Sequence, residues 1–165
     1  RGMVAGRTYR LDARYRRFPT VVHALDDGAD RLADRAALIV PEAGRDRALT
    51  YRQYRSAVAG MARHFLALGA RGRAIAVCMG NGMEAAVACF GGMAAGALTV
   101  PMNPNYTPAE LKPLLKDVAP HILCCDTAMA ARARDHAAEI GIPHVEVLGA
   151  GGRTIDAWAN DAALR

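Results

Sequence analysis

The stretch MAAGALTVPMNPNYTPAEL, residues 93–111, decides how this chain folds. A helix stops at Gly96, a short β-rich run follows, and a polar turn then opens a second helix. Thr107, Pro108 and Glu110 supply the start of that helix: a cap, a proline at the first helical position and a glutamate at the third. Helix, strand, turn and helix in this order are typical of the crossover connection of a parallel sheet.

The rest of the chain continues this alternation. Strand patterns occupy residues 74–79, 97–101, 121–125 and 144–148, and the almost wholly apolar run at 74–79 is typical of a strand buried on both faces. Helical patterns separate and follow them, at 82–95, from 107 onward, at 127–140 and at 154–165. Strands that alternate with helices predict right-handed crossovers. We therefore expect an α/β fold of three layers, with a mostly parallel sheet and helices on both faces.

The segment before the sheet predicts a smaller unit. VVHALDDGADRLADR, residues 21–35, has the spacing of an amphipathic helix. Two strands, 37–40 and 48–51, flank a charged turn, which predicts a small N-terminal hairpin. Thr50 can then cap a helix over 51–68.

Several residues modify the expected helices. Asn81 with Glu84 three residues later resembles a capping box. Gly91 and Gly92 cost about 1 kcal/mol each relative to alanine inside a helix, so close backbone packing is expected there. Pro113 predicts that its helix is kinked, or shortened to a turn or two.

Composition restricts the classes of protein to consider. With 165 residues, 52% of them hydrophobic and 22% charged, the chain reads as one globular domain. No run approaches about eighteen apolar residues, so no membrane span is expected. No CxxC pair occurs among the four cysteines, Cys78, Cys89, Cys124 and Cys125. This pattern favours buried thiols in a reducing cytoplasm over disulfides.

Residues 1–20 are interpreted as a basic arm, separate from an α/β subdomain over residues 21–165. Arginines crowd this arm at positions 1, 7, 10, 14, 16 and 17. Arg7, Arg10, Arg14 and Arg17 would share one face of a helix, as in a transit peptide or a surface-binding helix. A solvated, partly ordered arm is favoured, because the serines of a transit peptide are missing. Without the arm the formal charge of +5 falls to near zero, so nucleic acid is not an expected partner.

Few side chains are spaced for catalysis. Ser56, the only serine, lies in the middle of a helix and not in a G-x-S-x-G elbow. No zinc-binding spacing connects the histidines, which are His23, His64, His121, His136 and His144. His121 precedes Cys124 and Cys125, but those two cysteines point to opposite faces of a strand. A hydrogen-bonded histidine at a strand start is therefore favoured over a metal ligand.

The charged residues also have structural explanations. Lys112 and Lys116, the only lysines, are one helical turn apart and are expected to be exposed. Cys125-Asp126 lies at the carboxyl end of a strand, where parallel sheets bind ligands, but Asp126 can equally cap the next helix. Both interpretations stay open. Two apparent acidic pairs are Asp26 with Asp27 and Asp30 with Asp34. They are interpreted as carboxylates on the solvated face of the first helix.

GNGMEA, residues 80–85, follows a strand and opens a helix, as the G-x-G-x-x-A form of the dinucleotide fingerprint does. Such a motif places a pyrophosphate at the helix N-terminus. Two observations oppose this interpretation: the next strand ends without an acidic residue for a ribose, and this is not the first strand of the domain.

Taken together, the motifs resemble the N-terminal part of the adenylate-forming superfamily, which includes acyl-CoA synthetases, luciferases and peptide-synthetase adenylation domains. LTYRQY, residues 49–54, looks like its first core motif, and residues 93–111 look like its second. The Asn-Pro-x-Tyr-Thr extension at 103–107 is common among acyl-CoA synthetases. The family also has a typical order of helix stop, buried strand, polar turn with a glutamate and small-residue helix, which is found in LGARGRAIAVCMGNGMEAAVACFGG. The later segment LKPLLKDVAPHILCCD fits the family as well. The resemblance covers roughly residues 18–150 and implies the N-terminal subdomain of the acyl-CoA synthetase fold.

The resemblance also implies a reaction. Members of this superfamily activate a carboxylate with ATP, release pyrophosphate and pass the acyl group to coenzyme A. ATP, Mg²⁺ and coenzyme A are thus implied for the full-length parent. That chemistry needs a Ser/Thr/Gly-rich phosphate loop with a lysine. A chain with one serine and two neighbouring lysines does not contain such a loop, so we expect no catalytic, cofactor-binding or metal-binding residue here.

We therefore expect a fragment, expressed or proteolytic, truncated before the phosphate-binding loop and inactive alone. Nineteen arginines against two lysines indicate a bacterial, cytoplasmic source. Acetate, fatty, aromatic and bile-type acids all stay open as substrates. Two alternatives remain: a free-standing Rossmann-like nucleotide-binding module that uses Gly80–Gly82, and a non-catalytic interaction module that forms a homodimer.

Overall fold

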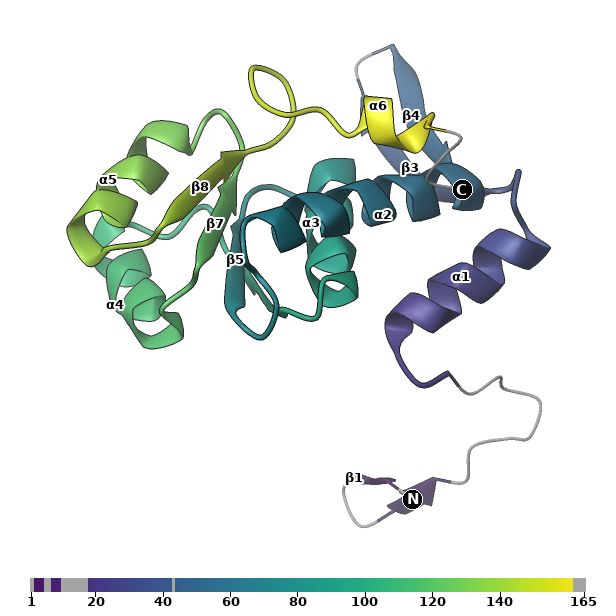
Figure 1. Ribbon diagram of the computed structural model, residues 1–165, viewed down its shortest axis with the longest axis horizontal. Helices are drawn as coiled ribbons and strands as arrows, with labels where there is room; N and C mark the ends of the chain where they lie inside the picture. Colours follow the sequence, from purple (N-terminus) through teal and green to yellow (C-terminus); the bar gives the residue numbers. More distant parts are fainter. Residues whose placement is uncertain (1, 5–6, 10–17, 43, 162–165) are drawn as a thin grey trace.

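A four-stranded parallel sheet forms the centre of the molecule. The computed structural model describes residues 2–4, 7–9, 18–42 and 44–161. The strands are β5 (Ala74–Cys78), β6 (Leu98–Met102), β7 (Ile122–Cys125) and β8 (His144–Val147), and they lie in the order β6-β5-β7-β8 (Figure 1). Each neighbouring pair is parallel. The predicted parallel sheet is confirmed.

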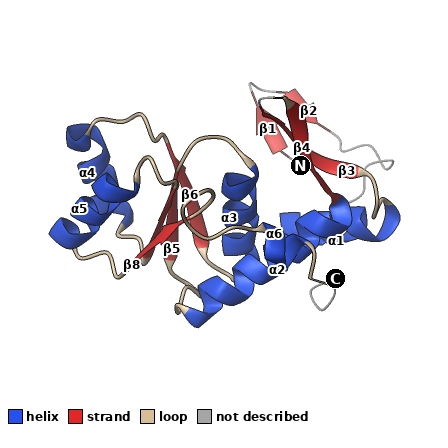
Figure 2. Cartoon of the chain, turned by 90° about the horizontal axis from the view of Figure 1, so that it is seen from above, coloured by secondary structure: helices blue, strands red, loops and turns tan. Residues whose placement is uncertain are grey.

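Helices cover both faces of this sheet. On one face lie α2 (Tyr51–Ala67) and α3 (Met83–Ala94); on the other lie α4 (Pro108–Val118) and α5 (Ala130–Ile140) (Figure 2). The predicted three-layer α/β fold is therefore confirmed, with its helices on the expected segments. In the last predicted helix, 154–165, only α6 (Asp156–Ala159) is helical among the described residues, and 162–165 lie outside them.

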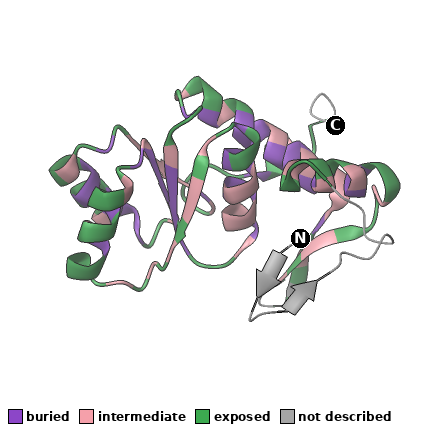
Figure 3. Ribbon diagram, turned by 90° about the horizontal axis from the view of Figure 1, so that it is seen from below, coloured by how far each residue is buried: buried purple, intermediate pink, exposed green. Residues whose placement is uncertain are grey.

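Alternation along the central strand divides the core into two clusters. Ile75 and Val77 of β5 pack with the α2–α3 side, whereas Ala76 and Cys78 pack with the α4–α5 side. The purple ribbon of Figure 3 marks this buried centre. Each large apolar side chain that is fully buried contributes about 1.5–3 kcal/mol relative to leaving it exposed. Because alternate residues of β5 belong to the two clusters, this one strand packs against the helices on both faces.

A helix and a hairpin precede the sheet. α1 (Val21–Arg31) is followed by β3 (Ala36–Glu42) and β4 (Arg45–Thr50), which pair antiparallel as predicted. The helix ends at Arg31 instead of continuing to residue 35. The reason is that the carbonyls of Ala33 and Arg35 accept hydrogen bonds from the amides of Arg52 and Tyr51, in the first turn of α2. That turn would otherwise leave these amides without partners.

Two helix starts were predicted correctly and one was not. Thr50 and Thr107 each form a complete capping box. Asn81 forms none: Gly82 is the N-cap of α3 without a side-chain cap hydrogen bond, and Glu84 instead pairs with Arg47 at 2.8 Å. A guanidinium partner from β4 replaces the cap contact that local spacing suggested.

The shortening predicted from Pro113 is wrong, because α4 continues past it to Val118. Proline frees the carbonyl four residues earlier, that of Ala109, and both residues are exposed. Water can hydrogen-bond this carbonyl, so the helix need not end. The close packing predicted at Gly91 is confirmed: a Cβ there would lie 2.7 Å from the Cβ of Met61.

Part of the basic arm is described. β1 (Gly2–Val4) and β2 (Arg7–Tyr9) pair antiparallel, so a continuous helical face that includes Arg7 is wrong. Arg10, Arg14 and Arg17 lie outside the described residues. Across the described parts of the chain, no helix has both the length and the apolar character needed to cross a bilayer.

Candidate functional site

The strand order creates a switch point at the carboxyl edge of the sheet. After β5 the chain passes into α3 on one face, and after the neighbouring β7 it passes into α5 on the other. Loops that diverge from adjacent parallel strands leave a crevice between them, the usual ligand position in open α/β sheets. The candidate site is therefore the edge formed by the loops after β5, β6 and β7.

A crevice of about 360 Å³ lies between the β5 and β7 loops and extends to Leu148–Ala150. The side chains of Asp126 and Thr127, which line it, already have partners. Asp126 accepts hydrogen bonds from the amides of Met129 at 2.9 Å and Gly80 at 3.4 Å. Thr127 donates its hydroxyl to the carbonyl of Ala150. Asp126 therefore caps the turn that precedes α5 and not the helix itself, because the N-cap of α5 is Met129 without a side-chain hydrogen bond; the ligand interpretation stays a prediction.

The glycine fingerprint does not form a pyrophosphate cradle. The φ angle of Gly82 is −176°, and Gly80 is not among the positive-φ glycines, so neither position requires glycine for a left-handed turn. The amide of Gly80 faces the Asp126 carboxylate, and Glu84, which pairs with Arg47, also lines the crevice. The Asp126 carboxylate at this position would repel a phosphate.

A second, larger cavity lies between the β5 and β6 loops, and we call it the carboxyl-edge cleft. Its volume is about 670 Å³. Val77, Ala85, Ala86 and Cys89 contribute its apolar side, and the segments 79–82 and 101–105 contribute the rest. None of the described residues that line it carries a charged side chain. The cleft is therefore a neutral cavity at the edge where ligands are expected.

Arg132 of α5 holds the loop that carries the Asn-Pro-Asn-Tyr-Thr motif. Its guanidinium donates to the carbonyls of Pro104 at 2.5 Å and Tyr106 at 3.2 Å. Within the loop, the amide of Asn105 donates to the side-chain oxygen of Asn103 at 2.9 Å. Sequence reasoning missed Arg132, because backbone carbonyls leave no residue-type signal at the partner positions.

His121 is hydrogen-bonded and Ser56 lies buried in the middle of a helix, as predicted. His121 Nε2 lies 2.8 Å from the carbonyl of Leu68, so this nitrogen carries the proton and Nδ1 accepts from Arg73. Ser56 is fully buried and donates to the carbonyl of Arg52. These hydrogen bonds give both residues structural roles.

The cysteines are free thiols on both faces of the sheet. Cys124 packs in the cluster with α2 and α3, and Cys125 packs in the cluster with α4 and α5, as their alternation predicted. Burial raises the pKa of Cys78 and Cys125 to about 11. Within the described ranges, no group of three or more His, Cys, Asp or Glu residues is arranged to hold a metal ion.

Acidic residues of α1 and of the turn after it pair with arginines. Asp30 contacts Arg55 and Asp34 contacts Arg52 across to α2, and both carboxylates stay exposed. Asp27 pairs with Arg31. Lys112 is partly exposed and pairs with Glu139 of α5, whereas Lys116 is exposed as predicted. Asp26 and Asp30 are exposed on α1 as predicted, whereas Asp27 is half-buried and Asp34 lies beyond the end of the helix.

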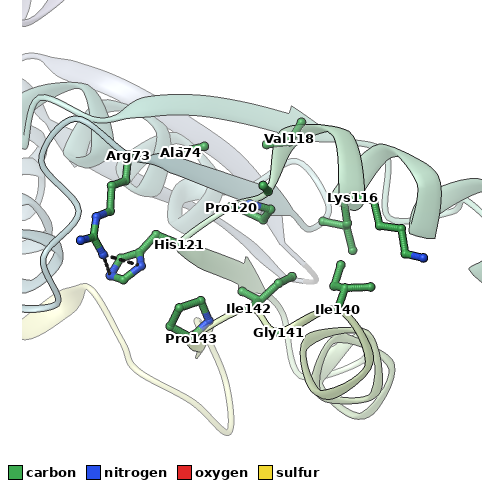
Figure 4. A pocket seen from close by; sticks show the side chains of 12 residues that line it. Arg73, Ala74, Lys116, Val118, Pro120, His121, Ile140, Gly141, Ile142 and Pro143 are labelled. Carbon is green, nitrogen blue, oxygen red and sulfur yellow. Dashed lines mark hydrogen bonds between the residues drawn. The ribbon is translucent and has the colours of Figure 1, made fainter.

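A further cavity of about 510 Å³ opens at the opposite, amino edge of the sheet. Arg73 and His121 line one side of it and Lys116 the other, with Ile140 and Ile142 between them (Figure 4). Arg73 is exposed there and donates to His121. This cavity shares no lining residue with either carboxyl-edge cavity, so the motif loops have no part in it.

Comparisons with known proteins give consistent matches. The model of the family described as AMP-binding enzyme matches residues 25–162. Phosphinothricin tripeptide synthetase PhsC from Streptomyces viridochromogenes is 34% identical over 122 residues, 73% of this chain and 11% of PhsC. The 4-coumarate--CoA ligase-like 9 protein of Oryza sativa subsp. japonica is 32% identical over 135 residues, 81% of this chain and 23% of that protein.

The fold has counterparts among solved structures. ATP-bound MatB from Rhodopseudomonas palustris superposes with a TM-score of 0.71 at 25% identity. The superposition covers 88% of this chain and 28% of MatB. The chain thus spans about a quarter or less of the length of the two curated relatives, and slightly more than a quarter of MatB.

Proposed function

The chain belongs to the AMP-binding enzyme family, and from this premise we propose that it is the N-terminal part of an acid–thiol ligase. In the first half-reaction, a carboxylate oxygen of the acid attacks the α-phosphorus of ATP, and pyrophosphate leaves. In the second, a thiol sulfur attacks the carbonyl carbon of the acyl-adenylate, and AMP leaves. The observation that carries the proposal is the family match over residues 25–162.

We propose coenzyme A as the thiol acceptor. The Asn-Pro-Asn-Tyr-Thr loop at 103–107 supports this choice, since that extension is common among acyl-CoA synthetases. The similarity to 4-coumarate--CoA ligase-like 9 supports it as well. The similarity to a tripeptide synthetase favours a second candidate, an adenylation domain that delivers an amino acid to the thiol of a carrier protein.

The ATP-dependent step is proposed to use groups from the rest of the enzyme. The crevice at Gly80 does not fit a triphosphate, because Asp126 already accepts from the Gly80 amide and Glu84 lies beside it. ATP, Mg²⁺ and coenzyme A are accordingly assigned to the full-length parent, and the 165-residue chain alone is expected to be inactive.

The test compares this chain with the complete polypeptide that contains it. ATP–pyrophosphate exchange is measured for both with short-chain, long-chain and aromatic carboxylates and with amino acids. We expect exchange above background for the complete polypeptide with at least one acid, and background for the chain alone. Coenzyme A and a carrier protein then serve as alternative acceptors. Thioester formed on the carrier protein alone would favour the peptide-synthetase candidate, and no exchange with any acid would refute the ligase proposal.

A further inference from the structure

We propose that sulfur side chains at the carboxyl ends of β5, β6 and β7 form a binding site for Cu⁺, with the thiolates of Cys78 and Cys125 and the thioether of Met129 as ligands. We call this group the sulfur cluster, and its members are Cys78, Met102, Cys125 and Met129. Cu⁺ binding there requires neither ATP nor an acid, so it is independent of the proposed ligase activity.

Strand register places three sulfur side chains in one row across the sheet. Cys78 of β5 lies opposite Met102 of β6 on one side and opposite Cys125 of β7 on the other. Neighbouring strands are about 4.8 Å apart, and opposite residues point to the same face. Accordingly, all three belong to, or pack against, the core cluster with α4 and α5. The row therefore brings three sulfur atoms to one face at the carboxyl edge.

Helix α5 adds a fourth sulfur above this row. Met129, the N-cap of α5, is buried, and its Sδ lies 3.5 Å from Cys78 Sγ. Sulfur atoms that share a metal ion at about 2.3 Å, the zinc–sulfur distance, lie roughly 3.8 Å apart. A shift of a few tenths of an ångström would therefore admit an ion between them. Because Cys78 and Cys125 are fully buried, water competes little for such an ion.

The donor set determines which ion fits. Ca²⁺ and Mg²⁺ take oxygen ligands, whereas soft thiolates and thioethers favour Cu⁺. A structural zinc site takes four Cys, His or carboxylate ligands. In the part of the chain that the structure describes, no third His, Cys, Asp or Glu joins the two cysteines in a metal-binding group. Thioethers complete the coordination of Cu⁺, so the cluster favours Cu⁺ over Zn²⁺.

Charge is balanced from α5. When Cu⁺ binds, each thiol loses its proton to solvent and its sulfur forms a bond to the metal. Two thiolates and one Cu⁺ leave a single net negative charge. The guanidinium of Arg132 offsets it, because its Nη2 lies 3.2 Å from Met129 Sδ. Burial raises the pKa of the Cys78 thiol to about 11; Arg132 opposes this rise, and Asp126 adds to it.

An entry route leads to the cluster from the carboxyl-edge cleft. Met102 and Asn103 both line that cleft. Cys78 Sγ lies 3.9 Å from the carbonyl oxygen of Asn103, so the thiol is next to the cleft wall. An ion that enters the cleft meets the half-buried Met102 first and the buried thiol next. A path from solvent is one of the requirements for a metal site.

The experiment titrates the reduced chain, without oxygen, into the coloured bicinchoninate complex of Cu⁺. We expect the chain to remove about one Cu⁺ from the chelator and to release protons into a weak buffer. X-ray absorption at the copper edge should show only sulfur around the metal. An equal concentration of Zn²⁺ should not displace the Cu⁺. Because the ion binds the folded chain, Cu⁺ should also raise Tm.

Matched double variants locate the site, because each keeps two thiols on one face of the sheet. Cys78→Ala/Cys125→Ala should weaken Cu⁺ binding more than about 100-fold, since even outer-shell partners of a metal contribute roughly 10–100-fold. Cys89→Ala/Cys124→Ala removes the thiols of the other face and should leave the affinity unchanged. Met129→Leu nearly conserves volume and should weaken binding by about tenfold or more. Far-ultraviolet circular dichroism checks that each variant is folded.

Failure of the wild-type chain to take Cu⁺ from bicinchoninate would overturn the inference. Equal weakening in the two double variants would do the same, because it would mean that any pair of thiols suffices. So would nitrogen or oxygen ligands at the copper, displacement by Zn²⁺, unchanged affinity in Met129→Leu, or a Tm that does not rise. Pyrophosphate exchange by the complete polypeptide enters none of these measurements, so either proposal can fail while the other holds.

Discussion

Replacing Gly91 by alanine sets two effects of opposite sign against each other. Alanine is better than glycine in a helix interior by about 1 kcal/mol, so helix propensity alone predicts stabilisation. The packing of α3 on α2 predicts the reverse. The new Cβ would lie 2.7 Å from the Cβ and 2.6 Å from the Cγ of Met61, although carbon atoms prefer about 3.5–4.0 Å.

The steric effect should win. Met61 is fully buried and its Cβ is fixed to the backbone of α2, so a rotamer change cannot relieve both contacts. Relief requires the helices to separate by nearly 1 Å, which forfeits a quarter to a half of the local dispersion energy. Overpacking typically costs about 1–3 kcal/mol. Subtracting the propensity gain of about 1 kcal/mol leaves Gly91→Ala destabilised by up to about 2 kcal/mol.

Thermal unfolding followed by circular dichroism measures this change. For a chain of this size, a loss of up to about 2 kcal/mol corresponds to a decrease in Tm of up to roughly 8 °C. In a Met61→Ala background the Cγ contact is absent, and the cost of Gly91→Ala should fall by at least about 0.5 kcal/mol. A rise in Tm, or the same change in both backgrounds, would refute the steric argument.

Three further predictions follow from caps, clamps and buried thiols. Thr107→Ala should lower the free energy of unfolding by about 1 kcal/mol in urea titrations, and a loss equally large in Thr107→Ser would contradict the capping role. Arg132→Gln should accelerate amide hydrogen exchange at 103–107 and leave α2 unaffected, so uniform acceleration would argue against a local clamp. Because burial raises the pKa of Cys78 and Cys125 to about 11, unfolded thiols near about 8.5 lose protons first. Stability should therefore fall as the pH rises through this window, and an equal urea midpoint at about pH 7 and pH 10 would count against it.

The sequence predicted those features whose causes are local. Strand β5 is an uninterrupted apolar run, and a strand buried on both faces needs one. All residues of the α4 capping box lie within positions 107–110. Gly91 could be assigned to close packing because glycine inside a helix needs a compensating contact. In the first two cases the residues concerned are neighbours in sequence; at Gly91 only the signal is local, because its partner, Met61, belongs to another helix.

The failures share the opposite property. Asn81 does not cap α3, and Glu84 contacts Arg47, which lies 37 residues earlier in the chain. The end of α1 depends on amides at the start of α2. Alternation of strands and helices also does not reveal which strand is central, so neither the switch point between β5 and β7 nor the cleft beside it could be located from sequence.

The contacts missed from sequence explain the chemistry of this edge. Arg132 donates to backbone carbonyls, Asp126 accepts from backbone amides, and Glu84 is neutralised by Arg47. Each of these charged groups contacts a partner within the fold, and none of them lines the carboxyl-edge cleft. An edge organised in this way can position a neutral group but offers no cation for a developing negative charge. A reaction that transfers an adenylyl group at this edge would therefore need its cations from elsewhere, which is why the complete polypeptide is the right sample for the exchange assay.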